Sequence, residues 1–326
     1  MIKVAILAFD YALGTTITGV VDLLMFAGVT WNRINDLPVK HFFDVKIYSA
    51  DGGMIHCVNG LTMMAHGSFN DIDKVDVVLV PTIAGNVDVT LAKNTAIIDT
   101  LQRIADNETL IASNCTGAFF LAEAGLLDHK AATTHWGFVN EFKRKYPAVK
   151  LQAEQLVSHD GNILCAGGGN AWFDLGLYLI ERFCDHETAV GTAKAFVLDM
   201  GRSNQLTYSP ILNKRYHNDE LVLNVQDYME KSFGQTISLE RMAEQFNLST
   251  RTLSRRFKQA TGETPNHYLQ TIRLEAARKL LEETSLSLPK ITLRVGYEDV
   301  SSFSVLFKKN TGVTPGSYRD RYRRRY

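Results

Sequence analysis

A stretch near the C-terminus repeats itself at an offset of 50 residues, and this repeat constrains the fold more than any other feature of the chain. In each copy a helical pattern ends at Gly-x-Thr-Pro, and an aromatic residue follows three positions after the proline. Two tandem helix-turn-helix units are therefore predicted, an arrangement suited to reading two stretches of a duplex major groove. The recurring residues are Ser254, Phe257, Lys258, Thr261, Gly262, Thr264, Pro265 and Tyr268, with their counterparts Ser304, Phe307, Lys308, Thr311, Gly312, Thr314, Pro315 and Tyr318.

Charge is distributed unevenly along the chain. The 326 residues suit two domains, and 35 basic side chains balance 35 acidic ones. Residues 221–326, however, hold 18 Lys and Arg against 11 Asp and Glu, whereas residues 1–220 hold 17 against 24. A basic C-terminal domain joined to an acidic N-terminal one indicates a DNA reader with a sensor attached. On charge alone, the solvated faces of an ordinary enzyme remain an alternative.

The cysteines and the apolar pattern exclude several classes of protein. Cys57, Cys115, Cys165 and Cys184 are widely spaced and form no CxxC or zinc-like pattern, so neither a metal nor a cofactor is predicted. The N-terminus resembles a core strand and not a signal peptide. Because no run of about 20 apolar residues occurs, no membrane span is expected. The default expectation is a reduced, cytoplasmic protein.

The N-terminal part alternates between strand and helix patterns, which predicts an open, largely parallel α/β sheet of the flavodoxin-like kind. Strands are expected at residues 2–9, 43–49, 75–81 and 109–113, with a hairpin formed by 156–158 and 163–166. Helices are expected at residues 18–33, 87–105, 117–124, 170–183 and 187–198.

From residue 221 onward the pattern is helical only. Residues 209–219 break the preceding pattern with Pro, Asn and mixed charge, so the linker is placed there, between domains 1–208 and 220–326. The two helix-turn-helix units are expected at about 239–260 and 289–310, joined by a long helix over 265–282. The predicted C-terminal domain is therefore all-α.

Candidate DNA-binding side chains lie on the second helix of each unit. In the first unit Leu253 and Phe257 are four residues apart and are expected to face inward, which turns the polar positions outward. Arg binds guanine bidentately, and Ser and Thr contact bases or phosphates. The second unit has no Arg in this helix, so it is expected to rely on hydroxyls, apolar contact and phosphate contacts from Lys308 and Lys309. The candidates are Thr250, Arg251, Thr252, Ser254, Arg255, Lys258, Ser301, Ser302, Ser304 and Lys308.

About 80 residues of this region resemble the AraC/XylS family of bacterial transcription regulators. The matching stretches are LERMAEQFNLSTRTLSRRFKQATGETPNHYLQTIRLEAARKLL and ITLRVGYEDVSSFSVLFKKNTGVTPGSYR. The resemblance implies that both second helices enter successive major grooves, and that Ala276 and Leu280 belong to the rigid helix that fixes their spacing. Val305 departs from the family pattern, because many relatives have Arg there; direct base reading by the second unit is then in question.

The sharpest feature of the N-terminal domain is Ser113-Asn114-Cys115-Thr116-Gly117-Ala118, where a strand runs through a small-residue turn into a helix. Such an elbow places the Cys115 sulfur at a helix N-terminus, which favours the thiolate or an anionic ligand. His135 and Trp136 offer an imidazole and an aromatic wall nearby, although a structural histidine is the alternative. A cation–π role is considered for Trp136 and Trp172, which also suit a core.

Residues 2–185 resemble the DJ-1/PfpI superfamily, in the class I glutamine-amidotransferase-like branch that is fused to AraC-type domains. The matching stretches are KVAILAFD, SNCTGAFFLAEAGLLDHKAATTHW and ILCAGGGNAWFDLGLYLIERF. In enzymes of the superfamily the elbow Cys works with a His and an acid. Here Thr16 aligns with the acid, and Asp10 is a poorly placed substitute, so a binding pocket is predicted instead of a catalytic site. Its expected residues are Gly85, Asn86, Asn114, Cys115, Thr116 and His135.

Together these resemblances imply a sequence-specific transcription regulator whose partners are double-stranded DNA and a small-molecule effector. Relatives often respond to nitrogenous metabolites, and the N-terminal domain is expected to form a homodimer. RNA polymerase is left open as a further partner. The rival prediction is a hydrolase or hydratase that uses Cys115 and His135, and a third is redox sensing through Cys115.

Overall fold

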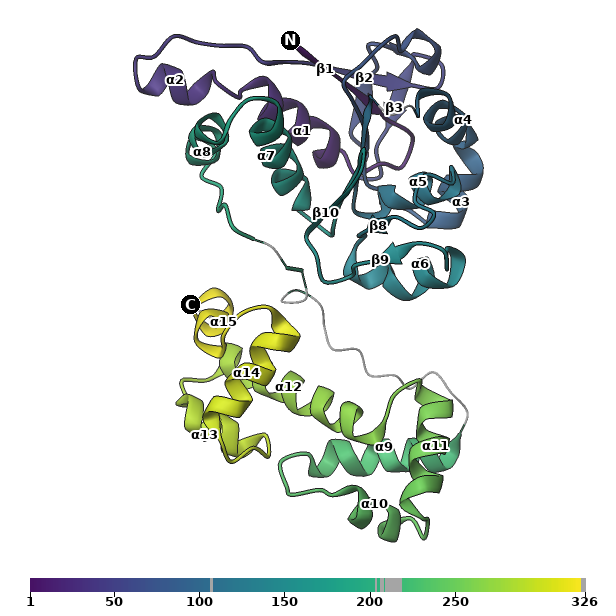
Figure 1. The fold of residues 1–326 in the computed structure, drawn as a ribbon, viewed down its shortest axis with the longest axis vertical. Coiled ribbons are helices and arrows are strands. Elements are labelled where there is room, and N and C mark those ends of the chain that lie inside the picture. The colour runs from purple at the N-terminus through teal and green to yellow at the C-terminus, as the bar shows by residue number, and fades with distance from the viewer. Residues whose placement is uncertain (106–107, 203, 206–207, 209–218, 324–326) are drawn as a thin grey trace. The chain divides into compact units, whose positions relative to one another are not determined.

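The computed structural model describes residues 1–105, 108–202, 204–205, 208 and 219–323. The chain divides into two compact units, Met1–Gln205 and Leu206–Tyr326, which are described separately as the N-terminal and C-terminal domains (Figure 1). Of the predicted linker 209–219, only Asp219 belongs to the described residues.

The N-terminal domain is built on a seven-stranded sheet in the order β10-β11-β7-β6-β1-β2-β5. All neighbouring strands are parallel except β10 and β11, which form the predicted hairpin. The predicted open parallel sheet is confirmed. The strands are β1 (Ile2–Leu7), β2 (Phe43–Ser49), β5 (Gly67–Ser68), β6 (Val77–Val80), β7 (Leu110–Asn114), β10 (Val157–Asp160) and β11 (Ile163–Ala166).

Helices cover both faces of this sheet, which explains why the central strand β6 is apolar at every position and fully buried. One face carries α1 (Thr15–Met25), α2 (Thr30–Ile34), α7 (Ala171–Phe183) and α8 (His186–Ala195) (Figure 1). The other carries α3 (Val87–Lys93), α4 (Thr95–Ile104) and α5 (Ala118–Glu123).

Short elements complete the N-terminal domain. Two small sheets pair β3 (Met54–His56) with β4 (Thr62–Met64), and β8 (Ala131–Ala132) with β9 (Lys150–Leu151). The helix α6 spans Val139–Lys145, and 3₁₀ turns occupy η1 (Phe69–Asp71), η2 (Cys115–Gly117) and η3 (Trp136–Phe138).

Two helices predicted as continuous are each broken in two, so these two predictions were wrong. The helix expected over residues 18–33 is interrupted at Gly28, whose φ of +72° suits glycine and whose Cβ would lie 2.5 Å from the Phe42 ring. The helix expected over 87–105 is interrupted at Asn94, which leaves helical geometry at φ −123° and donates its side-chain N–H to the carbonyl of Thr90. Neither break interrupts the apolar spacing that suggested a single helix.

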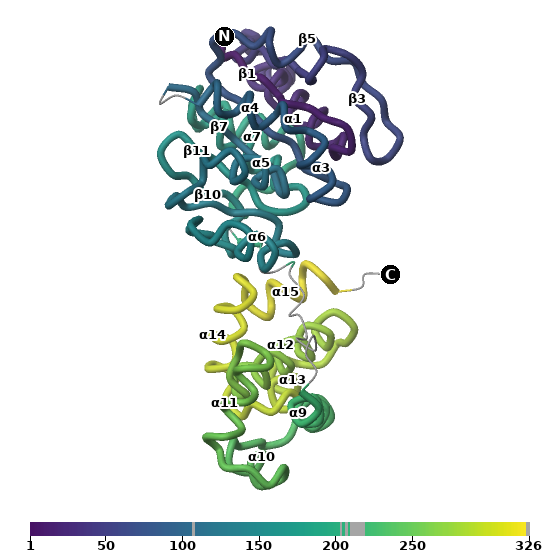
Figure 2. Tube along the Cα trace, turned by 90° about the vertical axis from the view of Figure 1, so that its right-hand side faces the viewer, coloured from purple at the N-terminus to yellow at the C-terminus, as the bar shows by residue number. Residues whose placement is uncertain are grey.

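The C-terminal domain is all-α over its described residues, as predicted. Its helices are α9 (Glu220–Ser232), α10 (Leu239–Gln245), α11 (Thr250–Thr261), α12 (Pro265–Glu283), α13 (Leu288–Arg294), α14 (Val300–Thr311) and α15 (Pro315–Tyr322) (Figure 2). One core gathers around Leu253, Phe257 and Tyr268, and a second around Phe303, Phe307 and Tyr318. The helix α12 contributes to both.

Two further observations concern membrane spans and metal sites within the described residues. None of the helices there is both long and apolar enough to cross a membrane. In the same part of the chain, no three or more His, Cys, Asp and Glu side chains are placed to hold a metal ion.

Candidate DNA-binding helices and ligand site

Each second helix ends in the same way in the two helix-turn-helix units. Gly262 and Gly312 take left-handed φ angles of +79° and +81°, which glycine adopts without steric strain. Their N–H groups donate to the carbonyls of Lys258 and Lys308, each at 2.8 Å. The repeated glycines therefore cap α11 and α14 and turn the chain toward the next helix.

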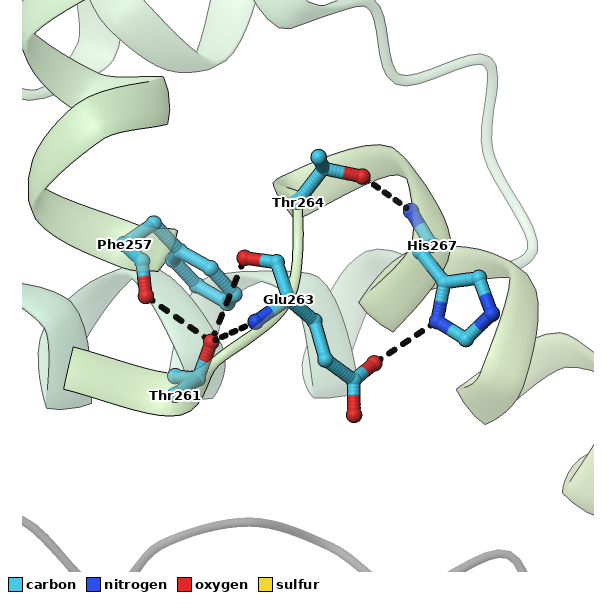
Figure 3. Close-up of polar contacts among 5 residues, drawn as sticks. All are labelled: Phe257, Thr261, Glu263, Thr264 and His267. Atoms are coloured by element: carbon cyan, nitrogen blue, oxygen red, sulfur yellow. Dashed lines mark hydrogen bonds and ion pairs between the residues drawn. The ribbon is translucent and has the colours of Figure 1, made fainter. Parts of the chain in front are cut away.

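A threonine just before each glycine holds the turn together, and Figure 3 shows this turn in the first unit. The Thr261 hydroxyl donates to the carbonyl of Phe257 at 2.8 Å and accepts from the Glu263 N–H at 3.2 Å. Thr311 makes the equivalent bond to the carbonyl of Phe307, also at 2.8 Å. Because one hydroxyl serves both as donor to the helix and as acceptor from the turn, it fixes where each second helix stops.

The Thr-Pro pair then starts the following helix. The Thr264 and Thr314 hydroxyls accept from the backbone N–H three residues later, at 3.3 and 3.2 Å, and proline occupies the first turn of both α12 and α15. This is a regular N-cap, in which proline replaces an N–H that would have no helical partner.

The repeated tyrosines lock each second helix from the side. The Tyr268 ring packs edge-on against Phe257 at 5.4 Å, and its hydroxyl donates to Glu230 at 2.9 Å. Tyr318 packs in the same way on Phe307 at 5.5 Å, and its hydroxyl donates to Glu282 at 2.6 Å. Six of the eight recurring residue pairs thus build the frame that holds α11 and α14.

The outward faces of the two helices carry the predicted DNA-binding residues and differ in chemistry. Arg251, Arg255 and Lys258 are exposed on α11, and no ion pair or hydrogen bond engages their charged groups within the described residues. On α14 the matching positions hold Ser301, the 70 % exposed Val305 and Lys308. One face is therefore cationic, whereas the other combines hydroxyl, apolar and cationic groups.

Most of the remaining candidate side chains are partly buried or form hydrogen bonds within their own helix. The Thr252 hydroxyl lies 2.9 Å from that of Ser249, the N-cap of α11, and Thr250 is half-buried at the first position of that helix. Ser254 and Ser304 are half-buried, and the Ser304 hydroxyl donates to the carbonyl of Val300 at 2.7 Å. Ser302 is exposed beside its helix cap.

Arg256, which follows Arg255 directly, has a structural role. Its Nε donates to the Asp219 carboxylate at 2.7 Å, and this ion pair joins α11 to the start of α9. The hydrogen bond holds the pKa of Asp219 below its ordinary value. Adjacent arginines on one helix are thus divided between packing within the domain and presentation to solvent.

Arg273 of α12 joins the segment between α9 and α10 to the second helix-turn-helix unit. Its guanidinium donates to the carbonyls of Phe233 at 2.9 Å and Gln235 at 2.8 Å, and it lies over the Tyr297 ring at 5.2 Å. The 19 residues of α12 make a rod of about 28 Å between the units. Ala276 and Leu280 lie on this rod and pack against the second core, as the predicted connecting helix requires.

The elbow at Cys115 has the predicted strand-turn-helix layout. Cys115 follows β7 directly and takes a φ of +57°, an uncommon value for a residue other than glycine. Its carbonyl accepts from the Thr134 hydroxyl at 2.9 Å, and the neighbouring Thr116 hydroxyl donates to the Ile83 carbonyl at 2.7 Å. Asn114 is buried and donates to the Thr82 hydroxyl at 2.8 Å.

Burial at Cys115 opposes the thiolate that the elbow layout favours. Burial raises the pKa of the thiol, and this effect outweighs the N–H groups of Thr116 and Gly169, which favour the charged form. A 3₁₀ turn over Cys115–Gly117 also separates the sulfur from α5, which has only six residues. The helix dipole invoked from the sequence is therefore weak here.

His135 lies beside the elbow loops without an acidic partner among the described residues. Its Nδ1 accepts from the Gly137 N–H at 2.9 Å, and burial lowers the pKa of the ring. A Cβ on Gly168 would lie 2.2 Å from the ring, so glycine is needed there. The structure thus brings His135 against the loop that also faces the Cys115 sulfur.

Thr16, the residue aligned with the missing acid, belongs to the same buried network. Its hydroxyl donates to the Leu13 carbonyl at 2.7 Å and accepts from the Thr82 N–H at 3.2 Å. The Thr82 hydroxyl in turn accepts from Asn114. A neutral hydroxyl therefore occupies this position, close to the elbow, and the substitute Asp10 instead accepts from the His56 N–H at 2.8 Å.

The other predicted pocket residues, Gly85 and Asn86, make contacts with their own loop and helix and with Tyr11. Asn86 caps α3 by accepting from the Val89 N–H at 3.0 Å, and Gly85 lies against Tyr11. Trp172 is core: it is 7 % exposed, stacks on Phe173 at 3.6 Å, and touches Gly19 of α1 so closely that a Cβ there would lie 2.1 Å away.

Sequence reasoning missed two features of this domain. A cavity of about 250 Å³ lies beyond the carboxyl ends of β1 and β2, with Asp10, Asp51 and Lys93 among its lining residues. The second is Gln205, which is buried against the loops behind the elbow. Neither has a local sequence signal, because both arise only when distant segments are brought together.

Comparison with known proteins matches each domain to a protein family. The DJ-1/PfpI family profile matches residues 3–182, and a helix-turn-helix domain profile matches residues 242–321. The HTH-type transcriptional regulator CdhR of Pseudomonas aeruginosa is 30 % identical over 294 residues, which span 88 % of this chain and 86 % of that protein. GlxA of Rhizobium meliloti, also an HTH-type transcriptional regulator, is 27 % identical and covers 92 % of both chains.

Solved structures support the fold of the N-terminal domain. A crystal structure of an AraC family transcriptional regulator from Pseudomonas putida aligns with 60 % of this chain and all of its own, at a TM-score of 0.51 and 21 % identity. Drosophila melanogaster DJ-1beta aligns with 61 % of this chain and 98 % of its own, at a TM-score of 0.51 and 19 % identity. The chain therefore belongs to the AraC-type transcription regulators that carry a DJ-1/PfpI family domain at the N-terminus, and it is a DNA-binding regulator.

Proposed function

We propose that the regulator reads its operator with the exposed faces of α11 and α14, and that its N-terminal domain senses a small metabolite and forms the homodimer. Binding of the metabolite would favour one arrangement of the dimer and so change how the paired DNA-binding domains are spaced. RNA polymerase stays open as a further partner.

The observation that carries the DNA assignment is the division of the repeat into frame and face. Six of the eight recurring pairs cap, turn and brace α11 and α14. On the exposed faces Lys258 is matched by Lys308, whereas Arg251 is matched by Ser301 and Arg255 by Val305. Two helices held by equivalent contacts but carrying different side chains are suited to recognising two different DNA sequences. Arg251 and Arg255 would read guanine, and Val305 with Ser301 and Ser302 would contact thymine methyls and hydrogen-bonding groups.

Selection of bound sequences from a pool of random duplexes tests this assignment. The full-length protein should enrich a defined sequence from the pool, and the Arg255→Ala variant should enrich a sequence that is relaxed at one base pair. Enrichment of no sequence, or the same sequence for the variant, would contradict the proposed base readers.

For the sensing role we favour a site around Asn114, Cys115, Thr116 and His135, with Gly85 and Asn86 at its rim. Thermal-shift screening of amino acids, amines, betaines and small aldehydes on the wild type and Cys115→Ala tests it. A compound at about 100 times its dissociation constant adds about 2.7 kcal/mol to the stability of the native state. A hit that Cys115→Ala retains but Asp51→Asn loses would move the site to the 250 Å³ cavity.

We further propose that this elbow binds and does not catalyse. The support is the raised pKa of the Cys115 thiol, the hydroxyl of Thr16 where an acid is expected, and a His135 ring that no carboxylate orients within the described residues. Cys115-dependent hydrolysis or hydration remains the rival. Consumption of a screened compound by the wild type but not by Cys115→Ala would establish that rival.

A further inference from the structure

Gln205 is the last residue of the N-terminal domain and is 1 % exposed. The next residue in the sequence begins the segment that leads to the DNA-binding helices. A long polar side chain is seldom buried at the end of a domain unless its amide is fully hydrogen-bonded, because an unpaired buried amide is costly. The hydrogen-bond partners of Gln205 therefore identify the segments that hold the C-terminal end of this domain.

The carboxamide of Gln205 is bonded at both of its ends. The side-chain oxygen accepts from the Gly168 N–H at 3.0 Å. The side-chain nitrogen donates toward four oxygens, which are Thr134 O at 2.8 Å, Ala153 O at 3.0 Å, Thr133 Oγ1 at 3.1 Å and Gln155 O at 3.2 Å. The backbone adds a bond from the Gln205 N–H to the Glu154 carbonyl at 2.9 Å. Three separate loops are thus joined by one side chain.

Two of these loops carry the residues around Cys115. Thr134 lies between the bonded amide of Gln205 and the Cys115 carbonyl, to which its hydroxyl donates at 2.9 Å. Gly168, the donor to Gln205, packs against the His135 ring, and the next residue, Gly169, directs its N–H toward the Cys115 sulfur. Thr134 alone therefore separates Gln205 from Cys115 on one side, and the adjacent pair Gly168 and Gly169 separates them on the other.

Close packing makes the arrangement intolerant of small shifts. A Cβ on Gly167 would lie 2.8 Å from the Gln205 amide, so the glycine loop is pressed directly onto this side chain. Arg202 provides a second anchor, because its guanidinium pairs with Asp174 and donates to the Asn170 carbonyl at 3.2 Å. Gly167–Asn170 is thus held from both ends by residues that immediately precede the interdomain segment.

We propose that Gln205 is the positioning residue that couples the site around Cys115 to the segment leading into the DNA-binding domain. A change in the elbow loops moves the donor at Gly168 and the acceptor at Thr134, and Gln205 cannot follow one without losing the other. The backbone that continues toward the DNA-binding helices then shifts with the site. This inference rests on the proposed sensing role of the N-terminal domain.

Thermodynamic linkage gives a test that needs no identified effector. If the site affects DNA binding, DNA binding affects the site to the same degree in free energy. The probe is the rate at which iodoacetamide alkylates Cys115, followed by mass spectrometry in the full-length protein with and without the duplex recovered by selection. Alkylation of Cys184 provides the internal reference.

Three proteins are compared: the wild type, Gln205→Ala, and the control Gln152→Ala, whose half-buried side chain makes no hydrogen bond within the described residues. Saturating duplex should change the Cys115 rate at least threefold in the wild type and in Gln152→Ala. In Gln205→Ala the rate without DNA should rise about tenfold, and its dependence on DNA should disappear. Loss of the dependence separates coupling from a purely structural role, which would raise the rate and leave the dependence intact.

A dependence on DNA that survives in Gln205→Ala, or that is absent from the wild type, overturns the proposal. Failure to select any duplex would instead count against the proposed function. If Gln205→Ala does not fold, Gln205→Met keeps the shape without the hydrogen bonds. Hydrogen exchange of the wild type gives an independent result: peptides with Thr133–His135 and Gly167–Asn170 must change protection on DNA binding, and unchanged protection contradicts the coupling.

Discussion

Truncation of Arg255 to alanine should weaken binding to the selected duplex much more than binding to unrelated DNA. The side chain is exposed on α11, and no ion pair within the described residues competes for its guanidinium. A bidentate contact with guanine contributes about 1–3 kcal/mol of discrimination, which corresponds to a loss of about 5-fold to 150-fold in affinity. Fluorescence anisotropy at one fixed salt concentration measures it, with the selected duplex and a scrambled duplex of equal length.

Arg256→Ala is the matched control. It removes the same charge at the next position, but from a side chain that pairs with Asp219 within the domain. It should lower affinity slightly and equally for both duplexes. Equal losses of affinity for the two variants would refute the assignment of Arg255 to base recognition and of Arg256 to packing within the domain. A loss for Arg255→Ala that is the same on both duplexes would show a phosphate contact instead of base reading.

Further predictions concern Lys308 and Tyr318 in the C-terminal domain and Cys115 in the N-terminal domain. Lys308→Ala should reduce affinity evenly across sequences and lower the slope of log affinity against log salt by about one, as measured by titration at several salt concentrations. Tyr318→Phe removes the hydrogen bond to Glu282 and should lower the free energy of unfolding of the C-terminal domain by about 1–2 kcal/mol in denaturant titration, with α14 still folded. Because burial raises the pKa of Cys115 above its ordinary value of 9.0, the thiol stays protonated at neutral pH; its alkylation rate should still be increasing with pH beyond pH 9, and a plateau below pH 7 would contradict this. The same shift makes the folded state lose stability as the pH rises above 9.0, since the unfolded thiol ionises first.

Periodic patterns predicted the C-terminal helices well because their signals are local. A threonine, glycine and proline at fixed spacing specify a cap and a turn whatever surrounds them, and Thr261 and Gly262 do so in the structure. The division between buried Leu253 and exposed Arg255 also follows directly from helical spacing. The ion pair of Arg256 with Asp219 does not, because it depends on how α9 packs.

The N-terminal site was predictable in outline only. The strand before Cys115 and the small residues after it indicated the elbow, but the state of the thiol depends on burial by segments far away in the sequence. The break at Gly28 depends on contact with Phe42, which no helical pattern reveals. Gln205 was missed for the same reason, since all of its partners come from loops 37 to 72 residues away.

The most direct test of the account is interference footprinting of the full-length protein on its selected duplex, with methylation of guanine N7 and permanganate oxidation of thymine as the major-groove probes. The account predicts that each subunit gives two centres of interference about 10–10.5 base pairs apart on one face of the DNA, one for each of α11 and α14. The Arg255→Ala variant should lose interference at one base pair of the centre assigned to α11 and keep the centre assigned to α14 unchanged. A single centre, or two centres on opposite faces, would contradict the claim that both helices read successive major grooves.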